Sequence, residues 1–480
     1  MFDTYQCLVV HFRMQIDFTL ANVENSSAAC AKYMAVPYYH SMDYSTPNAL
    51  CRHHCITRTL LFLGCALWFL SAFAQSSGQT LVDPTEVGLS GERLARIDGL
   101  VQGYVDEGRL PGAIFAVARH GRTARIGAVG SLQPEMLFRI YSMTKPITVV
   151  AVLMLYEEGR FLLSDPVSRY LPEFTGMRVY VDEKGDKGRP GTRPAVQPIT
   201  IEDLLTHTAG LSYDDVTAAG VPKLYAEADL WSGDSLADFT AKVAALPLAF
   251  EPGSRWHYSV ANDVLGRLVE VVAGQPFDKF LEARILGPLK MNDTAFFVPD
   301  AKLDRFASEY QRDGSGMRLI ETPEESEYRN PEPVPFGGSG LVSTAADYMR
   351  FAQMLLNGGE LDGVRLLGNK TVELMMMDHL GPGFESPRLN DSWVGRTENR
   401  SGDMHLGFGY GFGGYVITDV AQNDVPGSVG TYAWGGGAST YFFIDPQEEL
   451  IGLFFTQLEP SDSYPLRSQF RGLVYQAIVD

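Results

Sequence analysis

The segment Phe138–Thr148 has the sequence FRIYSMTKPIT, which places Ser142 three positions before Lys145. Residues at i and i+3 lie on the same face of a helix, so Lys145 can reach the hydroxyl of Ser142. That hydroxyl becomes a good nucleophile only when a base removes its proton. A lysine can be that base where burial or neighbouring positive charge lowers its pKa. The pattern alone is equally compatible with a capping serine and an exposed lysine.

The residues around this segment favour the catalytic interpretation. Phe138–Tyr141 resembles a strand, and Ile147–Tyr156 is a helical run too apolar for a surface, ended by Gly159. Ser142 is therefore expected between the exit of a strand and the N-terminus of a helix. There, its backbone N–H and the helix dipole can stabilise an oxyanion.

The segments further out predict a layered fold. Strand-like runs at Ala113–Arg119 and Arg122–Val129 flank His120-Gly121, which predicts a hairpin. Helical patterns dominate until about residue 290, and strand signals return at Ala433–Ile444 and Leu450–Gln457. Early and late strands can share one antiparallel sheet flanked by helices. We therefore expect an α/β (α+β type) sheet domain formed by residues 85–165 and 330–480, with a mostly helical domain, 166–329, inserted.

Residues 1–74 have the features of an N-terminal extension followed by a secretory signal peptide. A basic run, Arg52–Arg58, precedes the apolar run Leu60–Leu70 and the A-x-A site Ala72–Ala74. The alternative is a buried helix. The signal would span about residues 42–74, with cleavage near Ala74 and export to the periplasm or the medium. The apolar run is too short to span a bilayer, so no stable membrane insertion is expected after cleavage.

Composition narrows the possible functions. The chain has 480 residues, of which 45% are hydrophobic and 20% charged, as in globular rather than disordered proteins. Its 39 basic and 58 acidic residues leave a formal charge of −19, which disfavours nucleic-acid binding. The five cysteines all precede the predicted cleavage site, so a mature chain has no disulfide and no thiolate.

The familiar motifs of other enzyme classes are missing. The sequence contains no G-x-S-x-G nucleophile elbow, no H-E-x-x-H and no P-loop. The histidines after residue 75 are scattered without the spacing of metal ligands. We therefore expect neither a metal nor another cofactor.

Several motifs together resemble the serine β-lactamase and penicillin-binding-protein superfamily, in its class C-like branch. FRIYSMTKPIT resembles the first motif, and the others follow in the same order over about residues 85–480. They are Leu204–Leu211 (LLTHTAGL), Tyr258-Ser259-Val260 with Asp263–Gly266 (DVLG), Gly337–Leu341 (GGSGL) and Trp434-Gly435-Gly436. The resemblance implies a β-lactamase-like fold.

The resemblance also implies roles for individual residues. Ser142 would form the acyl-enzyme, Lys145 would be its base, and Tyr258 would pass a proton to the leaving group. The backbone N–H groups of Ser142 and Gly437 would bind the oxyanion. A phenol with a pKa near 10 can take part at neutral pH if cations favour its phenolate, and Lys145 is the expected cation.

Two departures from the lactamase pattern point to a particular branch. Val260 stands where class C β-lactamases have the asparagine of Y-x-N, and Asn262 comes two positions late and is expected to point elsewhere. Trp434 replaces the lysine of K-T-G, which removes a cation suited to a substrate carboxylate. Both changes make the pocket more apolar, and the pattern resembles family VIII carboxylesterases. Trp434, Gly435, Gly436 and Val260 are accordingly expected to line the substrate site.

The expected function is an exported serine hydrolase that cleaves small-molecule esters with short acyl chains through an acyl-serine. The alternatives are a β-lactamase or D-amino-acid peptidase (amidase), and a non-catalytic penicillin-binding-like sensor. Val260 and Trp434 count against the first alternative. The presence of Ser142, Lys145 and Tyr258 counts against the second.

Overall fold

The computed structural model describes residues 81–182, 190–214, 220–314, 316–380, 407–423, 425–461 and 463–480. The extension and predicted signal peptide (1–74) lie outside these ranges, so export stays a prediction. The described residues all belong to one unit, Ser77–Asp480. Within them, no helix combines the length and apolarity needed to cross a membrane.

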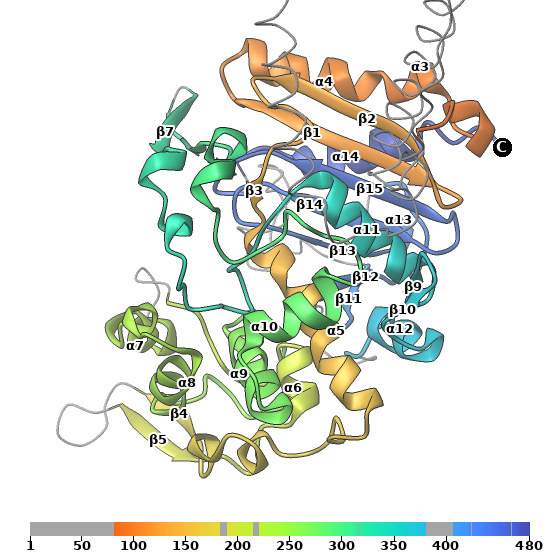
Figure 1. Cartoon of the computed structure of the whole chain (residues 1–480). Coiled ribbons are helices and arrows are strands. Elements are labelled where there is room, and N and C mark those ends of the chain that lie inside the picture. Colours follow the sequence, from red (N-terminus) through yellow and green to blue (C-terminus); the bar gives the residue numbers. More distant parts are fainter. Residues whose placement is uncertain are drawn as a thin grey trace, which may run out of the picture. The chain divides into compact units, whose positions relative to one another are not determined.

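A seven-stranded antiparallel sheet joins the two ends of this unit, as predicted (Figure 1). The predicted hairpin is confirmed as β1 (Gly112–Arg119) and β2 (Arg122–Gly130), and β1 also pairs with β15 (Leu450–Phe455). The strand order is β11-β12-β13-β14-β15-β1-β2. The remaining strands are β11 (Phe408–Tyr410), β12 (Tyr415–Ile417), β13 (Tyr432–Gly435) and β14 (Tyr441–Asp445).

The single strand signal at Ala433–Ile444 corresponds to two strands, β13 and β14. The chain reverses between them at Gly436–Thr440, where the Gly436 N–H donates to the Thr440 carbonyl at 2.9 Å. This turn brings the end of β13 against Ile140, because a Cβ at Gly436 would lie 2.4 Å from the Ile140 carbonyl oxygen. Only glycine allows so close an approach.

Helices cover both faces of the sheet. The ring of Phe443 in β14 contacts Phe470 of α14 (Leu466–Tyr475), whereas the adjacent Phe442 contacts Tyr348 of α11 (Ala345–Leu356). Successive side chains of a strand point to opposite faces, so α14 and α11 lie on opposite sides. Helices α3 (Gly91–Leu94) and α4 (Arg96–Asp106) pack beside α14.

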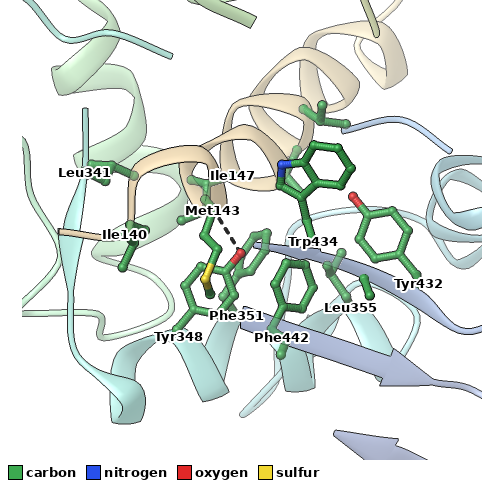
Figure 2. Packing of buried hydrophobic residues seen from close by; sticks show 14 of the residues in the cluster. Ile140, Met143, Ile147, Leu341, Tyr348, Phe351, Leu355, Tyr432, Trp434 and Phe442 are labelled. Atoms are coloured by element: carbon green, nitrogen blue, oxygen red, sulfur yellow. Dashed lines mark hydrogen bonds between the residues drawn. The ribbon is translucent and has the colours of Figure 1, made fainter. Parts of the chain in front are cut away.

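The predicted apolar helix is confirmed as α5, Thr144–Glu157, and begins earlier than expected. Its residues are buried from Thr144 through Leu155, so Lys145 lies in a buried first turn. Figure 2 shows the packing beneath this turn, where Met143 and Ile147 meet Tyr348 and Phe442. The Tyr348 hydroxyl donates to the Met143 carbonyl at 3.0 Å, which anchors the turn to α11.

The region 166–329 contains helices and also strands. Its helices are α6 (Ile201–Leu205), α7 (Val221–Glu227), α8 (Leu236–Ala244), α9 (Ala261–Ala273) and α10 (Phe277–Leu281). Its strands form one hairpin, β4 (Arg178–Asp182) with β5 (Gly191–Pro194), and a second, β6 (Glu309–Arg312) with β7 (Met317–Glu321). β6 also pairs with β16 (Leu458–Glu459), so this region is joined to the segment that follows β15. The domain boundaries stay a prediction.

The remaining strands and α-helices are short. β3 (Phe138–Arg139) pairs with β8 (Val342–Ser343), just before the turn that carries Ser142. The others are β9 (Glu360–Leu361), β10 (Val364–Arg365), α12 (Asn369–Met376) and α13 (Val420–Asn423).

Candidate active site

Ser142 lies in the 3₁₀ turn Tyr141–Met143, between β3 and α5, and its exposed fraction is 5%. The residue before it, Tyr141, has a φ of 42°, a conformation that is rare for a bulky side chain. The Tyr141 hydroxyl donates to the carboxylate of Glu309, at 2.8 Å from Oε1 and 3.0 Å from Oε2. This contact holds the strained residue and so fixes the backbone at Ser142.

Lys145 is completely buried beside Ser142. Its Nζ lies 3.1 Å from Ser142 Oγ, 3.2 Å from the hydroxyl oxygen of Tyr213 and 2.8 Å from the carbonyl oxygen of Gly338. Burial lowers the pKa of Lys145 below the ordinary lysine value, and the negative charge of Asp263 opposes that shift. A neutral amine has two N–H groups and one lone pair. With the N–H groups directed to Tyr213 and Gly338, the lone pair can accept the proton of Ser142.

Tyr258 approaches the same serine from the other side. Its hydroxyl donates to Ser142 Oγ at 2.6 Å, and Lys145 Nζ lies 4.6 Å from the centre of its ring. Burial raises the pKa of Tyr258 above its ordinary value, while hydrogen bonds with Ser142, Tyr213 and Trp434 oppose the rise.

The expectation that the cation of Lys145 favours the Tyr258 phenolate stays a prediction. The burial that raises the pKa of Tyr258 also lowers the pKa of Lys145 to about 7, so near neutral pH the lysine is divided between its amine and its cation. The site therefore combines a phenol of raised pKa with an amine of lowered pKa, both because of burial.

His207 holds the segment that carries Tyr258. It is buried, and its ring nitrogens contact Ser259 Oγ at 3.2 Å and Asn262 Nδ2 at 3.3 Å. Burial lowers the pKa of His207 well below its ordinary value, and the nearby Lys145 adds to the effect. Asn262 thus points toward His207, in line with the expectation that it does not replace the missing Y-x-N asparagine.

Asp263 and Tyr213 are neighbours of the site that sequence reasoning missed. Asp263 Oδ1 accepts from the Gly338 N–H at 2.8 Å, so it holds the turn whose carbonyl binds Lys145. A Cβ at Gly338 would lie 2.5 Å from Asp263 Oδ2, so this position suits only glycine. The available signal was the place of Asp263 at the start of the motif DVLG, which carries part of the resemblance without an implied role for this residue. Tyr213 carries no comparable signal, because its role depends on a loop conformation.

Trp434 lies at the end of β13 and is 3% exposed. The centre of its ring is 5.5 Å from that of Tyr258 and 5.5 Å from that of Tyr410. A neutral aromatic side chain therefore stands beside Tyr258 where the lactamase pattern has a cation. Gly437 follows β13, and a Cβ there would be 3.7 Å from the Tyr141 ring, so this backbone runs past the serine turn.

The other three predicted substrate-site residues have their own packing neighbours, and Gly436 lies against the Ile140 carbonyl, so its contact with a substrate stays a prediction. Val260 is completely buried at the start of α9, and a Cβ at Gly435 would meet the guanidinium of Arg467, in α14, at 2.5 Å. Contact of Val260 or Gly435 with a substrate stays a prediction. Among the described residues, no cluster of histidine and acidic side chains could hold a metal ion.

The arrangement is suited to nucleophilic acyl transfer. A buried serine contacts both a base and a proton donor, and the backbone at Gly437 passes the same turn. Such a constellation on a sheet flanked by helices defines a serine hydrolase.

Comparison with known proteins supports the assignment to the serine hydrolases. Residues 97–476 match the Beta-lactamase family, and the chain belongs to this family, in the serine β-lactamase and penicillin-binding-protein superfamily, close to the family VIII esterases.

Two relatives are esterases by name. Esterase EstB of Burkholderia gladioli is 33% identical over 427 residues, which cover 82% of this chain and 98% of the relative. Lovastatin esterase of Penicillium rubens is 30% identical over 379 residues, covering 74% of this chain and 91% of the relative. The solved structure of EstCE1, described as a hydrolase with promiscuous acyltransferase activity, superposes with a TM-score of 0.66 at 28% identity. It covers 80% of this chain and 99% of its own.

Proposed function

We propose that this protein is a carboxylesterase that cleaves short-chain, small-molecule esters through an acyl intermediate on Ser142. The observation that carries the proposal is the double contact of Ser142 Oγ, at 3.1 Å from Lys145 Nζ and 2.6 Å from the Tyr258 hydroxyl. The esterase relatives support the choice of substrate class. Export through the predicted signal peptide is part of the same proposal.

In the acylation step, Lys145 takes the proton of Ser142 as Oγ bonds to the ester carbonyl carbon. The negative charge that forms on the carbonyl oxygen is stabilised by the N–H groups of Ser142 and Gly437. Tyr258 gives its proton to the leaving alkoxide, the C–O bond breaks, and the alcohol departs. The proton on Lys145 then returns to Tyr258.

Deacylation reverses these roles with water as the nucleophile. Water loses a proton to the Tyr258–Lys145 pair and attacks the acyl carbon, and Ser142 Oγ recovers a proton as it leaves.

Trp434 favours an ester over a β-lactam. The lactam carboxylate would gain a charge-assisted hydrogen bond from a lysine at this position, and tryptophan offers only a neutral N–H. An ester also needs less assistance than an amide to expel its leaving group.

The test compares p-nitrophenyl butyrate with a chromogenic cephalosporin, using the wild-type protein and Ser142→Ala. We expect rapid ester turnover, little lactam turnover, and loss of both by at least about 10³-fold in the variant. Rapid lactam turnover would favour the β-lactamase alternative. Absence of turnover and of any covalent serine adduct would favour the non-catalytic sensor.

A second candidate reaction is transfer of the acyl group to an alcohol instead of water. The rings of Tyr213, Trp256 and Trp434 lie beside the Tyr258 ring, and such aromatic walls favour an organic acceptor over water. EstCE1, whose description names acyltransferase activity, has the same fold. Gas chromatography of reactions with vinyl butyrate and an alcohol would detect the transferred ester. Formation of butyric acid alone would exclude this reaction.

A further inference from the structure

The turn that carries Gly437 is fastened to strand β16. The Ser439 hydroxyl donates to the Leu458 carbonyl at 2.7 Å, and the Leu458 N–H donates to the Ala438 carbonyl at 3.1 Å. The next residue of β16 is Glu459. Its Oε1 lies 3.8 Å from the point where a Cβ on Gly437 would stand, and the Tyr141 ring lies 3.7 Å from that same point.

Glu459 is a half-buried carboxylate that no described residue satisfies. Among the described residues its carboxylate accepts no hydrogen bond and forms no ion pair, whereas its backbone belongs to the pairing of β16 with β6. Leaving a carboxylate in a partly desolvated position without a partner costs free energy, and burial raises the pKa of Glu459 accordingly. Such an uncompensated group beside a reactive centre calls for a functional explanation.

One cation opposes the effect of burial on Glu459. The charge of Arg139 lowers the pKa of Glu459, but this arginine is completely buried and already contacts Glu321 at 2.9 Å and Glu309 at 3.5 Å. The negative charges of these two carboxylates reach the groups beside Gly437. The charge of Glu309 raises the pKa of Tyr141, and the charge of Glu321 raises the pKa of Glu459. Arg139 thus shares its charge among three carboxylates. The other cation at this turn, Arg467, donates to the Gly436 carbonyl at 2.9 Å and, within the described part of the chain, makes no hydrogen bond or ion pair with Glu459.

We propose that Glu459 is a specificity-determining residue: its carboxylate, held beside Gly437, disfavours substrates with a negative charge near the scissile carbonyl and favours those with an ammonium group there. This inference rests on the proposed esterase function. It adds a repulsive element to the loss of a cation at Trp434, because the carboxylate of a β-lactam would approach a like charge. Glu459 acts on substrate choice and takes no part in the proton transfers.

The test uses nitrophenyl esters of pentanoic, 5-(trimethylammonio)pentanoic and 5-sulfopentanoic acid, which share the acyl chain, differ in terminal charge and carry no group that attacks the ester itself. A parallel series carries the charge on the alcohol instead. Both are assayed at pH 8 with the wild type, Glu459→Gln and Glu449→Gln. Glu449 is an exposed carboxylate at the far end of β14 from Gly437, so it controls for the change in net charge.

In at least one series we expect kcat/KM of the wild type to be about tenfold or more higher for the cationic ester than for the anionic one. That ratio is the effect expected of one nearby charge in a partly buried site. Glu459→Gln should remove most of that preference and leave the neutral ester within about twofold. Glu449→Gln should change neither. An unchanged preference in Glu459→Gln, with normal turnover of the neutral ester, would overturn the inference and leave the esterase function intact.

Failure of the esterase function gives a different result, namely no turnover of the neutral ester by the wild type. The charge preference is then measured by calorimetric binding of phenylboronic acid and its 3-carboxy and 3-aminomethyl derivatives. We expect the carboxylated probe to bind more weakly than the aminomethyl one, and Glu459→Gln to narrow the gap. Equal binding of the two charged probes to the wild type would overturn the inference.

Discussion

The carbonyl oxygen of Gly338 accepts a hydrogen bond from Lys145 Nζ at 2.8 Å, on a turn whose N–H is held by Asp263 at 2.8 Å. The position of the base thus depends on a residue that is remote in sequence from Lys145. This turn sets both the direction of the amine and, through Asp263, the charge near it. A change in this turn should therefore alter both the position of Lys145 and the pH range in which Lys145 is a neutral amine.

The activity should fall on the acid side as Lys145 gains a proton, because only the neutral amine can accept the proton of Ser142. Burial lowers the pKa of Lys145, so this acid limb should lie well below the ordinary lysine range near 10.5. The pH profile of kcat/KM for p-nitrophenyl butyrate measures it. A rate that keeps rising up to pH 10 would contradict a lysine base of lowered pKa.

Asp263→Asn should move that acid limb to still lower pH. The carboxylate of Asp263 raises the pKa of Lys145, and asparagine removes the charge while keeping an oxygen for the Gly338 N–H. The same pH profile checks this, with Asp347→Asn, another buried acid, as the control. A shift to higher pH would show that Asp263 does not act on Lys145 through its charge.

Tyr258→Phe should lower kcat by about 10²- to 10⁴-fold, the usual contribution of a positioned proton donor. Only the hydroxyl is lost, and the ring contacts with Trp434 and Trp256 remain available, so the protein should stay folded. Steady-state kinetics and thermal unfolding measure the two effects. Near-normal turnover of a poor leaving group, such as a simple alkyl ester, would refute the role of Tyr258.

Gly338→Ala should destabilise the protein and remove most of the activity. The new Cβ would stand 2.5 Å from Asp263 Oδ2, so either the turn or the carboxylate must shift. The double variant with Asp263→Ala relieves the overlap and should recover some stability relative to the single one, as thermal unfolding would show. Strict additivity of the two changes would argue against this contact.

Tyr141→Phe should cost about 1–3 kcal/mol of stability, because it leaves the buried Glu309 without its hydroxyl donor. It should also lower kcat more than it alters KM, since the backbone of Tyr141 positions Ser142. Denaturant unfolding and steady-state kinetics test both points. Wild-type stability together with wild-type kcat would show that the strained turn does not need this hydrogen bond.

Local patterns in the sequence were enough to predict the hairpin, helix α5 and the pairing of Ser142 with Lys145. Each depends on alternation, apolar periodicity or helical spacing within one segment. The approach of Tyr258 to Ser142 was predicted only through the resemblance of ordered motifs. The approach of Glu459 to Gly437 was not predicted, because it depends on how two distant turns are joined. The raised pKa of Tyr258 was not predicted for a similar reason, since burial is a property of the assembled site.

The pairing of β1 with β15 has a consequence for how the molecule is made. A growing chain that has not yet reached Leu450 leaves one edge of β1 without its partner, although the hairpin with β2 is complete. Such an open apolar edge can recruit strands from other chains, and contacts between residues so distant in sequence form slowly. Newly synthesised protein should thus depend on chaperones until its last strands emerge, and chains truncated before β15 should aggregate instead of accumulating as inactive monomers.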